Sequence, residues 1–372
     1  MNLRHFVVFL QQKLRKQVNF DTTMKVIIAI DSFKGCLSSK EANLAAAEGI
    51  RRGCPDAEII QVPVSDGGEG FLEAYHEIMG GSLVEVVVKD PLMRPITTKY
   101  LLCDDTALIE IAQASGLTLL TKEERNPLVA TSYGTGQLVA DAIHKGAREI
   151  IVGLGGSATS DAGIGMLRAI IESFPPAHCW NDIKVLKDVR FTIASDVKNP
   201  LYGENGAAHV FGIQKGATAR DVLLLDERAK KFAEVSAKHF GYDRSQMKGA
   251  GAAGGLGYAF LQYMDAAYRS GIDLLLEAVH FNELLKGADL VITGEGSADR
   301  QTLMGKLPMG ILKHSADIPV CLLAGRINHR DELLKAGFSH VVCINPDGLS
   351  LEEAMHKDVA IRNICRTVRM LV

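Results

Sequence analysis

The chain has 372 residues, a length that suits two domains rather than one small core. Apolar residues make up 47% and charged residues 23%, the balance of an ordinary globular protein. The 41 lysines and arginines against 44 acids give a net charge of −3, so there is no general basic field for nucleic acid. No run of 18 apolar residues occurs, and the sequence therefore predicts no membrane-spanning helix.

Two further features bear on the protein's location. The seven cysteines are scattered, with no C-x-x-C pair, and are interpreted as free thiols of a reducing, cytoplasmic compartment. Residues 1–23 are basic, and their apolar run "FVVFL" is too short for a signal peptide. We interpret them as an upstream extension rather than a targeting segment and exclude them from the fold.

The first eighty residues alternate strands and helices. The β-branched run at 25–30 is typical of a strand buried on both faces of a parallel sheet. Ser38 and Glu41 form a capping box before an alanine-rich helix. A second strand at 57–64 is followed by a glycine loop and a helix at 71–79. This order predicts βαβ units.

The pattern changes after Gly80. Residues 82–90 and 96–112 alternate in polarity, which favours mixed or antiparallel strands. A helix at about 135–145 and strands at 149–154 and 190–196 follow. The glycine-alanine segment 249–260 predicts close approach to another backbone.

The βαβ rhythm returns near Ile272, with a strand at "DLVIT", a helix begun near Pro308 and two more strands. The sequence therefore predicts an α/β protein in which residues 24–80 and 265–372 form one domain and residues 81–264 form an inserted one. A cleft between two such domains is a common place for a ligand.

Five loops at the ends of predicted strands carry glycines, hydroxyls and acids, and such edges are where α/β proteins bind ligands. In "DSFKG", Ser32 and Lys34 precede a capped helix whose N-terminus favours an anion. A self-capping turn with a solvated lysine is an equally good interpretation. In "SDGGEG", Asp66 and Glu69 lie on a loop that more often is only a turn.

The loop "GLGGSATSDAG" is the richest in anion-binding groups. Its backbone N–H groups can form a nest for an anion, and Asp161 can cap the helix that follows. The candidate phosphate-binding residues here are Gly155, Gly156, Ser157 and Thr159.

The loop "SDVKNP" contains Asp196, Lys198 and Asn199. A carboxylate at the end of a strand is well placed to orient a hydroxyl, as a general base or a metal ligand. Lys198 is as easily an ordinary surface lysine.

The stretch "VITGEGSADRQTLMGK" has the composition of a phosphate-binding loop without the G-x-x-x-x-G-K-[ST] spelling. Glu295 and Asp299 are candidate ligands for Mg²⁺. The candidates for phosphate are Gly294, Ser297, Thr302 and Lys306.

Together these loops suit phosphoryl transfer, which needs cations on the phosphate oxygens, a metal and a carboxylate for the acceptor hydroxyl. Other chemistries lack their motifs. There is no H-E-x-x-H, no G-x-S-x-G and no G-x-G-x-x-G after the first strand.

Long motifs in this order resemble those of bacterial type I glycerate kinases, from Met24 to the C-terminus. They are "AIDSFKG", "PVSDGGEG", "TSYGTGQL", "GLGGSATSDAGIGML", "SDVKNPLYGENGAAHVFGIQKGA", "GAGAAGGLGYAF" and "ITGEGSADRQTLMGKLPMG".

The resemblance implies a kinase that uses ATP and Mg²⁺ to phosphorylate D-glycerate, with 2-phosphoglycerate as the product. The fold that it implies is a Rossmann-like domain made from both chain ends, with a flavodoxin-like domain inserted. We expect no nucleic-acid or membrane partner, and a homodimer.

The family's "DSFKG" falls on residues 31–35, its "DGGEG" on 66–70 and its "GEGxxDxQTxxGK" on 294–306. Its catalytic roles do not transfer with the motifs, so our assignments rest on chemistry. Asp196 is our first choice for the base and Asp66 the second, and Lys34 is expected at the phosphates. Lys198, Lys215 and Arg94 are alternatives for the glycerate carboxylate.

The chain departs from the family pattern in several places. Ile30 and Ile213 replace prolines, Ser160 replaces asparagine, and the 167–195 connection is shorter and lacks a glycine-rich segment. If that segment shapes the acceptor pocket, the acceptor preference changes. Two other functions therefore stay open: a kinase for another small hydroxy acid, and a metabolite sensor without catalysis. A dehydrogenase is a more distant third.

Overall fold

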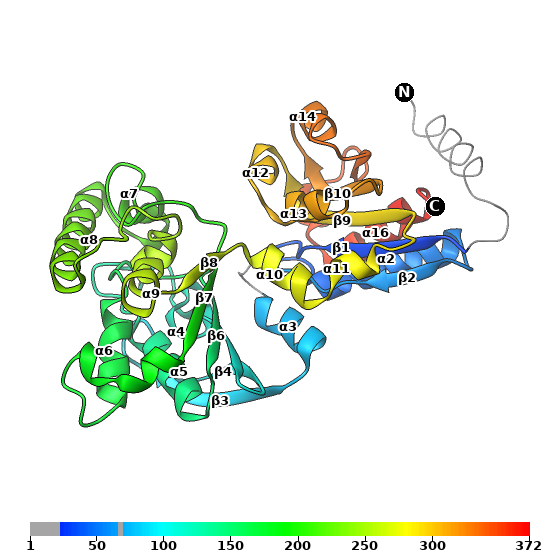
Figure 1. The fold of residues 1–372 in the computed structure, drawn as a ribbon. Helices are drawn as coiled ribbons and strands as arrows, with labels where there is room; N and C mark the ends of the chain where they lie inside the picture. The colour runs from blue at the N-terminus through cyan, green and yellow to red at the C-terminus, as the bar shows by residue number, and fades with distance from the viewer. Residues whose placement is uncertain (1–22, 66–69) are drawn as a thin grey trace. The chain divides into compact units, whose positions relative to one another are not determined.

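The computed structural model describes residues 23–65 and 70–372, and the chain divides into two units (Figure 1). Unit 1 comprises the chain up to Ser65 and from Leu275 onward, and unit 2 comprises the residues between them. The domain limits predicted from the sequence, after residue 80 and before residue 265, stay predictions. Residues 1–22, with the predicted N-terminal extension, and residues 66–69 lie outside the described part.

Unit 1 is built on a parallel sheet. Its strands lie in the order β11-β10-β9-β1-β2, and every pair is parallel. They are β1 (Lys25–Ile30), β2 (Glu58–Gln61), β9 (Leu290–Ala298), β10 (Val320–Ile327) and β11 (His340–Cys343). The β-branched run at 25–30 is a central strand, as predicted, and its residues from Val26 on are fully buried.

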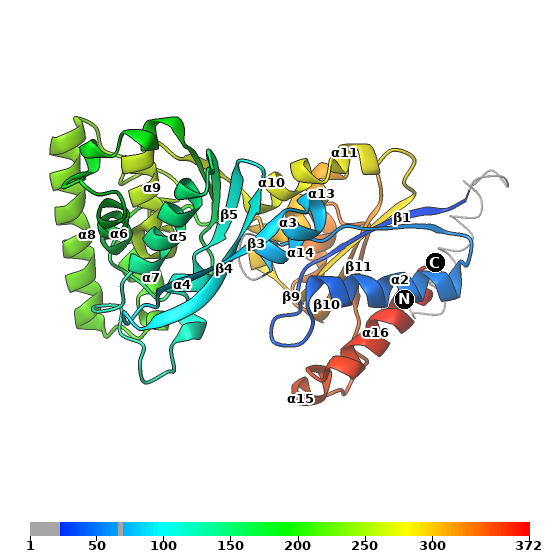
Figure 2. The ribbon, with the colours of Figure 1, turned by 90° about the horizontal axis from the view of Figure 1, so that it is seen from below.

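The helices of unit 1 connect these strands. They are α2 (Ser39–Gly53), α11 (Phe281–Leu284), α12 (Arg300–Leu303), α13 (Leu307–His314), α14 (Arg330–Lys335), α15 (Leu351–Ala354) and α16 (Lys357–Arg369). The predicted capping box of Ser38 and Glu41 is present at the start of α2. Figure 2 shows α2 beside α16. Gly49 permits this contact, because a Cβ there would lie 2.5 Å from the Cys365 carbonyl oxygen.

The strand order of unit 1 reverses between β1 and β9. From β1 the chain moves outward to β2, whereas from β9 it moves the other way to β10 and β11. In open α/β sheets, ligands bind outside the carboxyl ends of the strands at such a reversal. The loops after β1 and β9 are therefore positioned as a site.

Unit 2 has a mixed sheet in the order β3-β4-β5-β6-β7-β8. The pairs β3-β4 and β4-β5 are antiparallel, as the alternating sequence predicts, and the pairs from β5 to β8 are parallel. They are β3 (Ser82–Lys89), β4 (Pro95–Cys103), β5 (Thr106–Glu110), β6 (Glu149–Gly153), β7 (Arg190–Ala194) and β8 (Ala267–Arg269).

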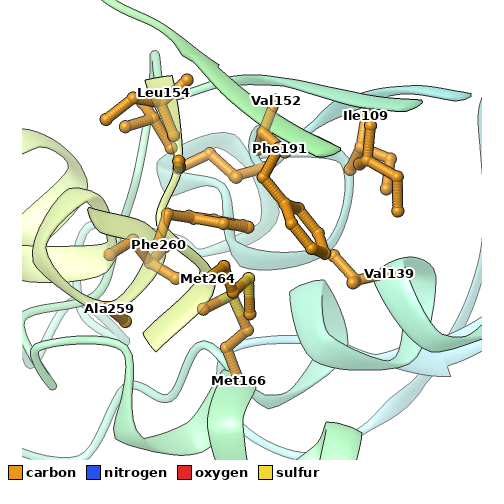
Figure 3. Packing of buried hydrophobic residues seen from close by; sticks show 14 of the residues in the cluster. Ile109, Val139, Val152, Leu154, Met166, Phe191, Ala259, Phe260 and Met264 are labelled. Atoms are coloured by element: carbon orange, nitrogen blue, oxygen red, sulfur yellow. The ribbon is translucent and has the colours of Figure 1, made fainter. Parts of the chain in front are cut away.

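Helices pack on this sheet and bury its apolar side chains. They are α3 (Phe71–Met79), α4 (Ala112–Ser115), α5 (Tyr133–His144), α6 (Ile164–Ser173), α7 (Ala207–Phe211), α8 (Ala219–Phe240) and α9 (Leu256–Met264), and α10 (Gly271–Ala278) leads back to unit 1. Figure 3 shows Phe191 of β7 facing Phe260 of α9, with ring centroids 6.1 Å apart, and Val139 of α5 and Met166 of α6 in the same cluster.

The glycine-alanine segment approaches other backbone, as predicted. It forms the short 3-10 helix η5 (Ala252–Gly255), and a Cβ on Gly254 would collide with the Thr159 carbonyl oxygen. This contact holds the loop after β6 against η5.

Part of the 167–195 connection, where the chain departs from its resemblance, forms η2 (Trp180–Asp182) and η3 (Lys184–Asp188). It leads directly into β7 at Arg190, so it lies at the amino end of that strand. The loops with candidate chemistry lie at the opposite, carboxyl ends of β6 and β7. Within unit 2, the segment therefore does not line them.

Candidate active site

The loops after β1 and β9 lie side by side in unit 1. The Asp31 N–H donates to the Gly294 carbonyl at 2.9 Å, and the Ser32 N–H donates to the Asp31 carboxylate at 2.7 Å. Lys34 is exposed on the same loop. The structure thus brings Ser32, Lys34 and Gly294 to one edge of the sheet, as the sequence predicts.

Glu295 lies inside β9, near its carboxyl end, rather than in the loop where the sequence predicted it. The residue is only 6% exposed, Thr302 donates its hydroxyl to one carboxylate oxygen at 2.5 Å, and the Lys306 ammonium lies 3.5 Å from the other. Burial raises the pKa of Glu295, against the lowering effect of Thr302 and Lys306. Three predicted site residues are therefore in direct contact.

Asp299 begins the short helix α12. Its carboxylate accepts the Gln301 N–H at 2.7 Å, and its backbone N–H donates to the Thr302 hydroxyl at 3.0 Å. The charge of Asp299 also contributes to the raised pKa of Glu295. Of the two acids proposed as metal ligands, Glu295 thus lies in β9 and Asp299 directly follows that strand.

In unit 2, a buried lysine holds the loop after β6. The Lys215 ammonium, at the end of the 3-10 helix η4 (Ile213–Lys215), donates to the Ser157 hydroxyl and to the Thr159 carbonyl, both at 2.7 Å. Lys215 is 3% exposed, and burial lowers its pKa to about 7 against the weaker effect of Asp161. Lys215 was one of three alternatives for the glycerate carboxylate, and in the structure it contacts the predicted phosphate loop.

The loop after β6 has a constrained backbone and a buried hydroxyl group without a partner. Gly156 has a φ of +72°, which few other residues adopt without strain. The buried hydroxyl oxygen of Thr159 has no hydrogen-bond partner within residues 23–65 and 70–372. Since a buried, unpaired polar group costs free energy, the hydroxyl is suited to a ligand. Ser157, Thr159 and Lys215 together are a candidate anion site, which we call the lysine loop.

The loop after β7 lies next to the lysine loop. Gly153 of β6 pairs with Ala194 of β7, so Gly155 and Asp196 each follow the pair by two residues. The charge of Asp196, after burial, raises the pKa of Tyr268 to about 12.

The two other candidates after β7 differ in their contacts. Lys198 is exposed, and the Asn199 amide donates to the Asn205 carbonyl at 2.9 Å. The strands thus bring Asp196, Lys198 and Asn199 to the same edge as the lysine loop.

Two predicted residues are not among these contacts. Arg94, in the turn before β4, pairs with Asp90 at 2.5 Å and with Glu124 at 2.6 Å, so its charge is already neutralised. Asp66 lies outside the described residues.

Sequence reasoning missed Glu110. It ends β5 opposite Gly153, is 4% exposed, and accepts the Leu72 N–H at 2.7 Å, which caps the start of α3. Burial raises its pKa. The signal was an acid inside the apolar run "TALIEIA", because a buried carboxylate needs a partner and rarely occurs without a role.

The groups at these edges define a class of protein. Lysines, hydroxyls, glycine-rich backbone and carboxylates at the carboxyl ends of parallel strands are the parts that phosphoryl transfer uses. Fold and site together are those of an α/β phosphotransferase.

Comparison with known proteins agrees. The sequence profile of the Glycerate kinase family matches residues 26–175 and 180–372. The chain belongs to the glycerate kinase family and is a kinase.

Individual relatives cover most of the chain. A glycerate kinase of Bacillus subtilis (strain 168) is 41% identical over 89% of this chain and 93% of its own. A glycerate 2-kinase of Escherichia coli (strain K12) is 38% identical over 93% and 96%. The fold matches a crystal structure from Salmonella typhimurium LT2, provisionally assigned as glycerate kinase 2, with a TM-score of 0.78 and 36% identity over 94% and 97% of the two chains.

Proposed function

We propose that this kinase transfers the γ-phosphoryl group of ATP to D-glycerate and forms 2-phosphoglycerate. The observation that carries the proposal is the lysine loop, an anion site with a buried ammonium that lies one strand away from the Asp196 carboxylate. The names of the Bacillus subtilis and Escherichia coli relatives support glycerate as the acceptor, and the latter supports the 2-phosphate.

The phosphates of ATP are assigned to the glycine loops and their cations. Lys215 and the backbone of Gly155 and Gly156 supply donors in unit 2, and Lys34 and Lys306 supply charge in unit 1. Ser32, Thr302 and the Gly294 backbone complete this set. Because developing charge is best stabilised by donors fixed in advance, the rigidly held Lys215 is the group from which we expect the largest contribution.

Asp196 is assigned as the group that accepts the proton of the glycerate hydroxyl, with Asp66 second. Lys198 is the best of the three cations proposed for the glycerate carboxylate. It is exposed and follows Asp196 by two residues. Arg94 is instead paired with two acids, and the Lys215 ammonium already donates to the Ser157 hydroxyl.

The chemistry of Glu295 and Asp299 fits Mg²⁺. No three histidine, cysteine or acidic side chains come together to hold a metal in the described ranges. Two carboxylates are nevertheless the usual protein share of a magnesium site, whose remaining ligands are water and phosphate oxygens. When bound, the ion would neutralise charge on the phosphates.

The location and assembly of the enzyme are also proposals. All seven cysteines are free thiols, which is consistent with a cytoplasmic enzyme. No helix in the described part of the chain has both the length and the apolar character to cross a membrane. A homodimer remains our expectation.

Phosphorus NMR of the reaction with ATP, Mg²⁺ and D-glycerate tests the proposal. A phosphate on the secondary carbon has one neighbouring proton and gives a doublet, whereas a phosphate on the primary carbon has two and gives a triplet. We expect a new doublet. A triplet would change the product, and intact ATP would contradict the proposal.

Two controls address the alternatives. A panel of small hydroxy acids in place of D-glycerate tests for another acceptor. Thermal stabilisation by ATP or D-glycerate without phosphate transfer would instead indicate a sensor.

A further inference from the structure

A pocket of about 420 Å³ in unit 2 has no role in the assignments above. It lies between the first turns of α5 and α6 and one side of α8. Its walls include Val129, Ile164 and Leu225, together with Ser160 of the loop after β6 and Arg228 of α8. Its volume is in the range of small-molecule and cofactor sites.

The free N–H groups of the two helices are already used. Asp161 accepts from the Ser132 N–H at 2.8 Å, the Gly165 N–H at 3.1 Å and the Gly163 N–H at 3.1 Å. The Ser132 hydroxyl in turn accepts the Met166 N–H at 3.0 Å. A helix N-terminus attracts an anion because of its unpaired donors, and here a carboxylate has taken them. The starts of α5 and α6 therefore do not offer these donors to a second phosphate.

The polar side chains at the edge of the pocket beside α6 are also already paired. The Tyr133 hydroxyl donates to Glu172 at 2.5 Å, and Arg168 pairs with the same carboxylate at 2.7 Å. These contacts fix the Tyr133 ring at the wall of the pocket and neutralise Arg168.

The lining side chains that are left for a ligand to contact are mostly apolar. Val129 is 61% exposed and Ile164 is 48% exposed, although both are large hydrophobic side chains at the pocket. Within the described part of the chain, the buried Ser160 hydroxyl oxygen has no hydrogen-bond partner. Arg228 forms no ion pair there. A flat, neutral heteroaromatic ring with a few polar atoms suits these walls, and small, charged glycerate does not.

We propose that this pocket binds the adenosine part of ATP. The inference rests on the proposed function, in which ATP is the donor. Ser160 directly follows Thr159, whose carbonyl accepts from Lys215. A nucleotide with its base in the pocket would therefore direct its phosphates along the same loop toward the lysine loop.

Blocking the pocket tests this inference. Val129→Trp fills its mouth from an exposed position, and the matched control is Val235→Trp on α8, which is 67% exposed and does not line the pocket. We expect Val129→Trp to raise the KM for ATP by about tenfold or more while the KM for D-glycerate stays unchanged. Inorganic tripolyphosphate, which has no base, should inhibit the variant and the wild type equally.

Several outcomes are decisive. If Val129→Trp has the same KM for ATP as Val235→Trp, the inference is overturned. It is also overturned if Val129→Trp weakens inhibition by tripolyphosphate as much as it weakens the use of ATP. If Val129→Trp melts early, Ile164→Asn replaces it with the same expectations. Should the wild type bind ATP by calorimetry without phosphorylating D-glycerate, the proposed function fails. The pocket is then still decided by whether Val129→Trp weakens ATP binding.

Discussion

The carboxyl edges of the two sheets carry different chemistry. In unit 1, the end of β9 and the loop after it combine the buried Glu295 with the partly exposed Lys306, so a carboxylate and a cation compensate each other. In unit 2, the buried Lys215 ammonium donates to a hydroxyl and a carbonyl, and the charge of Asp161 acts on it more weakly than burial does. Acids suit a metal, and an uncompensated ammonium suits an anion.

Taken separately, the two edges therefore suit different ligands. A buried charge without a counter-ion is costly, and Lys215 lowers the cost by losing its proton near pH 7. A bound phosphate would supply the missing counter-ion. Glu295 already has Lys306 and Thr302, so this edge can persist without a ligand.

Replacement of Asp196 should have the largest effect. Asp196→Asn keeps the size of the side chain and removes the base, so we expect kcat to fall by about 10²–10⁴. The control is Asp188→Asn, an exposed carboxylate just before the amino end of β7. Steady-state kinetics with D-glycerate measure both. Full kcat in Asp196→Asn would remove the assignment and shift attention to Asp66.

Lys215→Met should have the second largest effect on activity. We expect kcat/KM for ATP to fall by about 10²–10³, the usual cost of one preorganised donor to developing charge. The exposed Lys230 of α8 provides the control, as Lys230→Met. If Lys215→Met retained activity with only a lower melting temperature, the lysine would be a structural support of the loop rather than a phosphate ligand.

Glu295→Gln tests the acidic edge. Loss of one carboxylate ligand should raise the Mg²⁺ concentration for half-maximal activity by about 10–100-fold, while kcat at saturating Mg²⁺ changes less. Glu283→Gln, on the surface of unit 1, is the control. An unchanged Mg²⁺ requirement would contradict the metal assignment and leave Glu295 as a partner of Lys306 only.

The sequence predicted the fold well because local signals decide it. The β-branched run at 25–30, the capping box at Ser38 and the helix near Pro308 all appear in the structure. The strand-end loops also fall at sheet edges, since parallel strands must align their carboxyl ends. Periodicity and turn chemistry sufficed for these features.

The environments of individual site residues were beyond such signals. Lysines are almost never fully buried, and nothing near "FGIQKGA" distinguishes Lys215 from a surface residue. Its burial arises because η4 packs against a loop some sixty residues earlier in the chain. Glu110 likewise acquires its role only when the start of α3 reaches it. Contacts between distant segments create both environments.

The smallest effects are on stability, and the two edges should respond to pH in opposite directions. Burial raises the pKa of Glu295, so its folded state binds more protons than the unfolded chain. Its contribution to stability is complete below the ordinary value of 4.5 and is lost as the pH rises through the raised value. Burial lowers the pKa of Lys215 to about 7 from 10.5, so the unfolded chain binds more protons between these values. Its contribution is therefore complete above 10.5 and is lost as the pH falls toward about 7.

Denaturant unfolding at a series of pH values measures how the free energy of unfolding changes with pH for each group. The stability of the wild type relative to Lys215→Met should rise with pH between 7 and 10.5, at no more than about 1.4 kcal/mol per pH unit. Relative to Glu295→Gln it should fall as the pH rises above 4.5, within the same limit of about 1.4 kcal/mol per pH unit. A slope of zero would mean that the group keeps its ordinary pKa in the folded state, and slopes of the same sign would mean that one of the two pKa values shifts in the opposite direction. The contrast between a compensated acid and an uncompensated lysine would then be lost.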